Sequence, residues 1–200
     1  MSRADRRSLQ LRCGFASETG KRPDNQDFAA WLESGRVCVA AVADGVGGHK
    51  GGRVAAETTV RGFLDGYFAM PETLGVRRAA ARALESLNGW IYAQGRADPT
   101  LEGMACTFSA LVLQGRAAHV LHVGDSRVYR LGGDGFERLT EDHTAGRGDL
   151  AHALTRAVGF EPSLRLDHLT LRLRQHDRFL LSTDGVHGAL TDSALARLLA

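Results

Sequence analysis

Three stretches of the sequence place an aspartate directly after an apolar, strand-like run. They are VADG, HVGDS and LSTDG, and their acids are Asp44, Asp125 and Asp184. A fourth acid, Asp27, lies in GKRPDNQD, close to the basic residue Arg22. Asp followed by Gly is a common turn signal, so each stretch taken alone is explained as a turn. Several such acids at strand ends leave a second interpretation open, in which they serve one site.

Acids of this kind suit a site for hard divalent cations. Mg²⁺ and Mn²⁺ prefer carboxylates, backbone carbonyls and water as ligands. Asp44 opens the loop DGVGGHKGG, and Gly45 can turn its carbonyl toward an ion because it lacks a Cβ atom. Two cations about 4 Å apart lower the pKa of a water so that it attacks at neutral pH. Metal-assisted hydrolysis is therefore the alternative to simple turns.

Common phosphate-binding and zinc-binding motifs do not fit the sequence. GVGGHKG has a lysine where GxGxxG needs its last glycine, and Gly20-Lys21 is followed by Arg22, which spoils a P-loop. The sequence contains no HExxH, paired CxxC or GxSxG motif. The dinucleotide-binding, P-loop, zinc-protease and serine-hydrolase classes are therefore disfavoured.

The first half of the chain predicts one buried strand followed by two helices. Residues 36–45 are apolar on both alternating faces, which is typical of a strand between two layers. Apolar residues then recur at helical spacing over 60–67 and over 76–91, the second helix starting at Pro71-Glu72.

The second half predicts a meander of strands and a last helix. Short alternating runs are separated by Gly or Asp, and GGDG after VYRL is a hairpin signal. Residues 191–200 predict a helix with Thr191 as its N-cap. A strand, two helices, several strands and a helix in that order indicate an α+β fold.

Length and composition describe an ordinary globular domain. The chain has 200 residues, 44% of them apolar, and 25 basic against 23 acidic residues give a net charge of +2. This balance shows no excess of basic residues of the kind that nucleic-acid binding requires. No apolar run reaches the length of a membrane span. Three scattered cysteines, Cys13, Cys38 and Cys106, argue against a disulfide framework and suit a reducing compartment. We therefore expect a cytoplasmic protein, with neither nucleic acid nor, for this segment, a membrane as partner.

Seven motifs in order resemble the protein phosphatase 2C family, the metal-dependent serine/threonine phosphatases, in its bacterial type. They are GKRPDNQD, VADGVGGHKGG, GMACTFSALVL, HVGDSRVYRL, LTEDH, LTRAVG and FLLSTDGV, spread from about residue 14 to the end. Each motif alone is weak, whereas seven in sequence are very specific. The resemblance implies two antiparallel β-sheets packed as a sandwich with helices outside (αββα), in a single domain over residues 1–200.

The resemblance also assigns roles to the residues that match the family's motifs. It implies that Asp44 bridges two Mn²⁺ or Mg²⁺ ions and that the carbonyl of Gly45 binds one of them. Asp184 would be a ligand of the second ion, and Asp27 would hold metal-bound water. In bacterial-type members the position of Asp125, together with that of Asp184, can hold a third ion.

The reaction that the resemblance implies is direct hydrolysis of phosphoserine and phosphothreonine in proteins. A water bridging the two ions attacks phosphorus, while the ions and Arg22 neutralise charge on the phosphate oxygens. A bidentate guanidinium such as that of Arg22 suits a phosphate dianion better than lysine does. The expected partners are a phosphorylated protein and a protein kinase, on the same chain or another, since a kinase domain follows in some bacterial members.

Two departures from the family pattern support an alternative. Members usually carry, after the last helix, an Asp-Asn motif whose aspartate binds the second ion, and this sequence ends before one, so we expect a domain truncated at its C-terminus. Between LTEDHT and LTRAVG, the family's flap is shortened to AGRGDLAHA. These departures suit a catalytically weak or inactive regulatory domain that binds phosphopeptides. A small-molecule phosphatase with an open cleft is a third interpretation.

Overall fold

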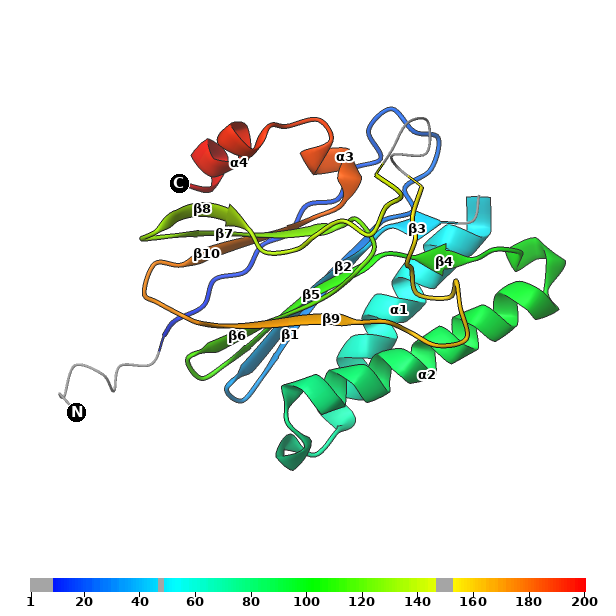
Figure 1. Cartoon of the computed structure of the whole chain (residues 1–200), viewed down its shortest axis with the longest axis horizontal. Coiled ribbons are helices and arrows are strands. Elements are labelled where there is room, and N and C mark those ends of the chain that lie inside the picture. Colours follow the sequence, from blue (N-terminus) through cyan, green and yellow to red (C-terminus); the bar gives the residue numbers. More distant parts are fainter. Residues whose placement is uncertain (1–8, 47–48, 147–152) are drawn as a thin grey trace.

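The protein folds as two packed antiparallel sheets with helices on the outer sides (Figure 1). The computed structural model describes residues 9–46, 49–146 and 153–200. The larger sheet contains, in spatial order, β1 (Phe28–Ser34), β2 (Val37–Ala43), β5 (Phe108–Gln114), β6 (Ala117–Val123) and β9 (Asp167–Arg172). The smaller sheet contains β10 (Arg178–Ser182), β7 (Arg127–Gly132) and β8 (Gly135–Arg138), and a short pair is formed by β3 (Gly45–Val46) and β4 (Ala105–Cys106).

Helices cover both outer faces of the two sheets. The long helices α1 (His49–Ala69) and α2 (Val76–Ala97) lie together on the large sheet, and α4 (Asp192–Leu199) lies beside the small sheet. The Arg178 side chain of β10 donates to the carbonyl oxygens of Leu199 and Ala200, which attaches the end of α4 to that sheet. No helix in the described ranges combines the length and apolarity needed to cross a bilayer. The observed αββα arrangement confirms the expected fold class.

Two apolar clusters correspond to the two interfaces between layers. Val39 and Ala43 of β2 belong to the larger cluster, which α1 and α2 complete. Leu111 and Val120 of the large sheet pack with Val128 of the small sheet in the second cluster. A strand such as β2 therefore has apolar residues at successive positions because one face meets helices and the other meets a sheet.

Strand register brings separate segments of the chain to one end of the sandwich. Phe28, the first residue of β1, pairs with Ala43, the last of β2. In the small sheet, Arg127, the first residue of β7, pairs with Ser182, the last of β10. The chain passes from the large sheet to the small one through residues 124–126, between β6 and β7. Residues flanking these strand ends must therefore lie near one another.

The predicted second helix is confirmed, but its predicted start is wrong. Glu72–Leu74 forms a separate 3-10 turn after Pro71, and α2 begins only at Val76. Gly75 between them has a φ of 76°, a conformation that interrupts a right-handed helix and that glycine adopts without strain.

The other expected elements are largely confirmed. The helical spacing over 60–67 lies within α1, which extends back to His49. Gly132 pairs with Gly135 in the predicted hairpin, and Thr191 caps α4 by accepting a hydrogen bond from the Ala194 amide at 3.3 Å. The sequence pattern did not predict β1, an edge strand whose Trp31 and Leu32 are both exposed, so that its apolar residues show no alternation. Most of the shortened flap, 147–152, lies outside the described residues.

Asn88 joins α2 to the segment that follows the flap, and its removal should destabilise the domain. This buried side chain donates to the Glu161 carbonyl and accepts from the Gly159 amide, both at 2.8 Å. Asn88→Ala leaves both backbone groups without a partner, so we expect the free energy of unfolding to fall by about 2–4 kcal/mol in urea titrations. Glu85→Ala, at an exposed position on the same helix, is the control. Equal stability of the two variants would contradict this role for Asn88.

Candidate functional site

Four aspartates flank strand ends at the same end of the sandwich. Asp27 precedes β1 and Asp44 follows β2, whose adjoining residues pair with each other. Asp125 lies in the passage from β6 to β7, and Asp184 begins the short helix α3 (Asp184–His187) after β10. Figure 1 shows α3 near the end of the sandwich where β3 lies, on the side opposite the hairpin turns. The antiparallel register thus gathers four acids that are up to 157 positions apart in sequence (184 − 27 = 157).

Asp44 is held at its strand end by Thr107, a residue between β4 and β5. The Asp44 amide donates to Thr107 Oγ1 at 2.9 Å, and the Thr107 amide donates to the Asp44 carbonyl at 2.9 Å. These reciprocal hydrogen bonds fix the backbone of Asp44. Its carboxylate can therefore be presented at a defined position between β2 and β3.

Glycines let the loop after Asp44 pack closely. A Cβ atom on Gly45 would overlap the backbone of Gly52, in the first turns of α1, and a Cβ on Gly52 would overlap the Gln26 side chain. The Gly45 amide also donates to the Gln26 carbonyl at 3.2 Å. The glycine-rich sequence is thus required by close backbone packing, which brings the start of α1 against the acid-bearing strand end.

The four carboxylates act on one another electrostatically. Burial raises the pKa of Asp44 to about 8, with contributions from the charge of Asp27, the charge of Asp184, a hydrogen bond to Asp27 and the charge of Asp125. Burial also raises the pKa of Asp125, and the charges of Asp184 and Asp142 add to that rise. Like charges held close together in a partly buried site disfavour ionisation, and an opposite charge among them relieves that repulsion.

Asp27 links the ends of the two sheets. The Thr183 hydroxyl, at the end of β10, donates to Asp27 Oδ2 at 2.7 Å, while the Asp27 amide donates to Asn25 Oδ1 at 2.9 Å. Thr183 immediately precedes Asp184. This hydrogen bond therefore limits the distance between Asp27, which precedes β1 of the large sheet, and Asp184, which follows β10 of the small sheet.

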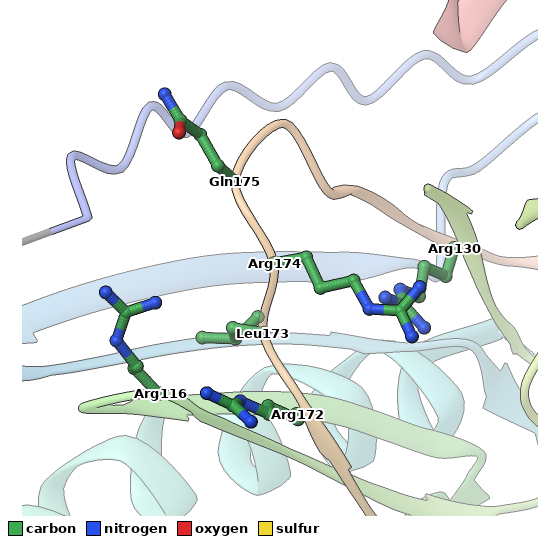
Figure 2. Close-up of a pocket in the computed structure, with 6 residues that line it drawn as sticks. All are labelled: Arg116, Arg130, Arg172, Leu173, Arg174 and Gln175. Carbon is green, nitrogen blue, oxygen red and sulfur yellow. The ribbon is translucent and has the colours of Figure 1, made fainter. Parts of the chain in front are cut away.

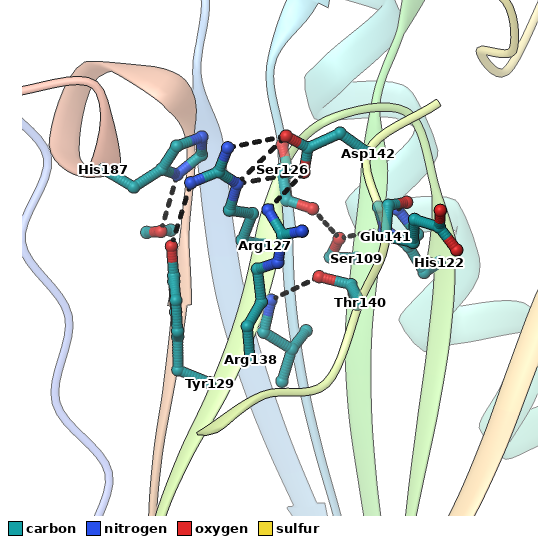
Figure 3. Close-up of polar contacts among 12 residues, drawn as sticks. Ser109, His122, Ser126, Arg127, Tyr129, Arg138, Thr140, Glu141, Asp142 and His187 are labelled. Atoms are coloured by element: carbon teal, nitrogen blue, oxygen red, sulfur yellow. Dashed lines mark hydrogen bonds and ion pairs between the residues drawn. The ribbon is translucent and has the colours of Figure 1, made fainter. Parts of the chain in front are cut away.

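A buried polar network supports the passage that carries Asp125. Thr107 Oγ1 lies 2.5 Å from the hydroxyl of Ser126, the residue after Asp125. Ser109 Oγ lies 2.9 Å from both the Ser126 carbonyl and His122 Nδ1. Figure 3 shows Ser109 between Ser126 and His122, joined to both by dashed lines. Because burial lowers the pKa of His122 to about 4, its ring is neutral at neutral pH and adds no charge beside the acids.

Arg127 fixes the other side of the same passage through an ion pair. Its Nε and Nη2 atoms donate to the two carboxylate oxygens of Asp142 at 2.9 and 2.6 Å, and its Nη1 atom donates to the Tyr129 hydroxyl at 3.2 Å (Figure 3). This bidentate geometry is strong and directional. The two residues that follow Asp125 are therefore both held in place, Ser126 by its contact with Thr107 and Arg127 by Asp142.

Arg22, the expected phosphate-binding residue, forms no hydrogen bond or ion pair with the acids in the described structure. It is exposed, in a turn in which its amide donates to the Thr19 carbonyl at 3.3 Å. No ion pair or hydrogen bond within the described part of the chain joins its guanidinium to the four aspartates. The structure therefore brings Asp27, Asp44, Asp125 and Asp184 together but does not place Arg22 against them.

A cavity of about 440 Å³ in the described part of the protein does not lie at the acids. It is lined by residues of the β5–β6 turn, of β7 and of the end of β9 with the segment after it: Arg116, Arg130, Arg172, Leu173, Arg174 and Gln175 (Figure 2). Strand register places these residues at the opposite end of the sandwich. A smaller cavity of about 190 Å³ lies beside Val123, two residues before Asp125. We give the acids more weight than cavity size, because charges accumulate there and metal-dependent chemistry needs no deep pocket.

The donor set fits divalent cations. Within the described ranges, no three His, Cys, Asp or Glu side chains lie so that they could together hold a metal ion. The mutual effect of four carboxylates on the pKa of Asp44 nevertheless concentrates negative charge around oxygen donors. Oxygen ligands of this kind, without a sulfur or paired imidazole, suit Mg²⁺ or Mn²⁺ and not zinc.

The sequence interpretation missed the residues that support the acids. Thr107 and Ser126 were not singled out, since a hydroxyl inside an apolar strand pattern carries no chemical motif by itself. Arg127 and Asp142 lie within the conspicuous stretches GDSR and TEDH, but their pairing depends on strand register. Thr183 was also missed. The available sequence signal for it was a small polar residue at a strand end, directly before Asp184.

Comparisons with known proteins identify one family. The family model described as protein phosphatase 2C matches residues 16–200. The serine/threonine phosphatase stp of Listeria innocua is 27% identical over 92% of this chain and 81% of its own length. Protein phosphatase PhpP of Streptococcus pneumoniae is 29% identical over 88% of this chain and 78% of its own. The solved structure of the S. agalactiae serine/threonine phosphatase matches with a TM-score of 0.82 and 26% identity, covering 90% of this chain and 81% of that one.

Replacing Asp44 by asparagine should stabilise the protein in a chelating buffer. A carboxyl whose pKa rises from about 3.9 in the unfolded chain to about 8 on folding favours the folded state below pH 4 and loses that contribution as the pH rises to 8. We therefore expect Asp44→Asn to melt at a higher temperature than the unaltered protein at pH 8, by roughly 2–4 °C for each kcal/mol gained. The difference should shrink toward pH 4. A lower melting temperature for Asp44→Asn at pH 8 would contradict the charge repulsion.

Thr107→Val should loosen the connection between Asp44 and the Asp125 passage. Valine keeps the shape of threonine but leaves the Asp44 amide and the Ser126 hydroxyl without their partner. We expect the free energy of unfolding to fall by about 1–3 kcal/mol, measured by urea titration. Thr73→Val, at an exposed position, is the control and should change little. Equal free energies of unfolding for Thr107→Val and Thr73→Val would show that the hydrogen bonds of Thr107 do not stabilise the fold.

Proposed function

The chain belongs to the protein phosphatase 2C family, and we propose that it is a Mn²⁺- or Mg²⁺-dependent protein serine/threonine phosphatase. One observation in the structure supports this more than any other: at a single end of the sandwich, burial and the charges of acids from distant parts of the chain raise the pKa values of Asp44 and Asp125. A site of this kind gains most from binding dications. The similar relatives are named as phosphatases, which favours hydrolysis over phosphopeptide binding alone.

We assign the cation-binding roles to the residues around Asp44. Asp44 would bind two ions, Gly45 would contribute its carbonyl, and Asp184 would bind the second ion. Asp27 would orient a water, and Asp125 with Asp184 would hold a third ion. Bound divalent cations would supply Lewis acidity, lowering the pKa of a water and neutralising phosphate charge.

The chain's own residues would position Asp44 and Asp27 and orient the substrate phosphate. The reciprocal hydrogen bonds with Thr107 keep the backbone of Asp44 still, and Thr183 keeps Asp27 at a fixed orientation by donating to Oδ2. Preorganised groups of this kind avoid the cost of rearrangement during the reaction. Arg22, on its exposed turn, would meet the phosphate of an incoming substrate and pair with two of its oxygens.

The proposed reaction defines the partners. Its substrate is a phosphorylated protein, and a protein kinase, on the same chain or another, must form that substrate. The free thiols of Cys13, Cys38 and Cys106 agree with a cytoplasmic location, where disulfides are rare.

Phosphate release from a phosphoserine or phosphothreonine peptide in millimolar Mn²⁺ tests the proposal. We expect turnover by the unaltered protein and a fall of at least about 100-fold in kcat for Asp44→Asn, because one carboxylate that two ions share is lost. Asp65→Asn, at an exposed position of α1, keeps the same change of charge away from the acids and should retain full activity. Comparable kcat values for the two variants would overturn the assignment of Asp44. A protein that binds the phosphopeptide without releasing phosphate would support a regulatory domain instead.

Arg22→Ala tests the proposed phosphate contact separately from the metal site. Loss of a bidentate charge-assisted pair should lower kcat/KM by about 10- to 100-fold, with Arg22→Lys intermediate because lysine offers no fork. Arg36→Ala, in the exposed β1–β2 turn at the other end of the sandwich, is the control. If Arg22→Ala and Arg36→Ala have equal kcat/KM values, Arg22 does not bind the substrate phosphate.

A further inference from the structure

Two of the three cysteines meet although they are far apart in sequence. The Sγ atoms of Cys13 and Cys38 lie 3.9 Å apart, and 25 positions separate the residues. Cys13 belongs to the segment before β1, which Figure 1 shows in blue, running along the sandwich toward α3. Cys38 is the second residue of β2 and pairs with Glu33 and Leu113 on the neighbouring strands. The contact therefore joins an irregular N-terminal segment to the centre of the large sheet.

The two thiols differ in their access to solvent. Cys13 is exposed, whereas Cys38 is 2% exposed. A small oxidant in solution therefore reaches Cys13, while Cys38 lies behind it as a neighbouring thiol. Reversible cysteine oxidation typically uses this combination of one accessible thiol and one resolving thiol.

We propose that Cys13 and Cys38 form a reversible intramolecular disulfide in response to an oxidant of the hydroperoxide class. The Cys13 thiolate attacks the peroxide, the O–O bond breaks, and Cys13 becomes a sulfenic acid while the oxidant leaves as hydroxide or alkoxide. The Cys38 sulfur then attacks the Cys13 sulfur, the S–O bond breaks, and the departing hydroxide leaves as water with the Cys38 proton. Two electrons leave the thiol pair, and the peroxide is reduced.

The geometry requires only a small movement. A disulfide bond is about 2.05 Å long, so the two Sγ atoms must approach by roughly 2 Å. Cys13 lies in exposed chain without regular secondary structure, so it can supply that movement while β2 stays in the sheet. A bond between these positions does not require the strands to separate.

The environment of each thiol determines which cysteine reacts first with the peroxide. Burial raises the pKa of Cys38 to about 12, with further contributions from the charge of Cys13, a hydrogen bond to Cys13 and the charge of Glu33. Cys38 is thus protonated and reacts poorly with peroxide by itself. Its position beside Cys13 compensates, because an adjacent thiol has a high effective concentration.

Cys106 provides an internal comparison. It is also buried, its thiol donates to Thr59 Oγ1 at 3.2 Å, and burial raises its pKa to about 12. It lies on β4, within the larger core cluster, away from exposed chain. We expect Cys106 to remain a free thiol under conditions that oxidise the other two.

A Cys13–Cys38 bond would anchor the segment that leads into the site. The closed loop includes Arg22 and Asp27, so the bond limits how far this segment can leave the sandwich. Closing a loop of this length also restricts the unfolded chain and stabilises the fold. Any effect on turnover depends on the proposed phosphatase function, whereas formation of the bond does not.

Peptide mapping by mass spectrometry after mild hydrogen peroxide treatment tests the proposal. In the unaltered protein we expect a linked pair of peptides containing Cys13 and Cys38, reversed by dithiothreitol, with Cys106 still open to alkylation after denaturation. The oxidised protein should melt roughly 5–10 °C higher than the reduced protein. Cys106→Ser should behave in the same way, whereas Cys13→Ser, at an exposed position, should show neither the linked peptides nor the shift.

Three results would overturn the proposal. One is a disulfide that joins two chains through Cys13. Another is oxidation of Cys13 to sulfinic acid while Cys38 stays free. The third is the absence of linked Cys13 and Cys38 peptides from peroxide-treated protein that is still folded. None of these readouts measures phosphatase activity, so their failure is separate from failure of the proposed function.

Discussion

Repulsion among carboxylates is the constraint on which the site depends. Asp44 would ionise readily in water, yet burial and the charges of Asp27, Asp184 and Asp125 raise its pKa to about 8. A fold that gathers like charges in this way gives up stability at neutral pH. The two apolar clusters supply stability that offsets this loss, and divalent cations would turn the same repulsion into affinity.

The architecture explains how such a site can be built from separate segments. Antiparallel pairing places the start of β1 beside the end of β2, and the end of β10 beside the start of β7. The first of these two junctions contributes Asp27 and Asp44, and the second contributes Asp125 and Asp184. Hydroxyl groups of Thr107, Ser126 and Thr183 connect the junctions. The glycines after Asp44 then let α1 approach closely enough to close the site from the helical side.

Sequence and structure agree where a pattern is local and disagree where partners are distant. The helix spacing, the GGDG hairpin and the Thr191 cap were predictable because neighbours in sequence determine them. The start of α2 was not, since the positive φ of Gly75 outweighed the Pro71-Glu72 signal. Asp44, Asp125 and Asp184 were found by their recurring place at strand ends, and Asp27 by its place in GKRPDNQD, a motif that resembles one of the family's. Their supporting hydroxyl groups, the Arg127–Asp142 pair and the contact of Cys13 with Cys38 depend on register and packing, which the sequence alone does not display.

The most direct measurement of the central claim is the titration of Asp44 itself, followed by carboxyl carbon NMR in metal-free buffer and again with Mg²⁺. Convergence of the four acids predicts a metal-free midpoint near pH 8, which saturating Mg²⁺ moves strongly downward because the cation favours the ionised carboxylate. Since the acids titrate as a coupled set, the midpoint belongs to Asp44 together with its neighbours. An ordinary midpoint near about pH 4 that Mg²⁺ leaves unchanged would show that the acids do not form one site.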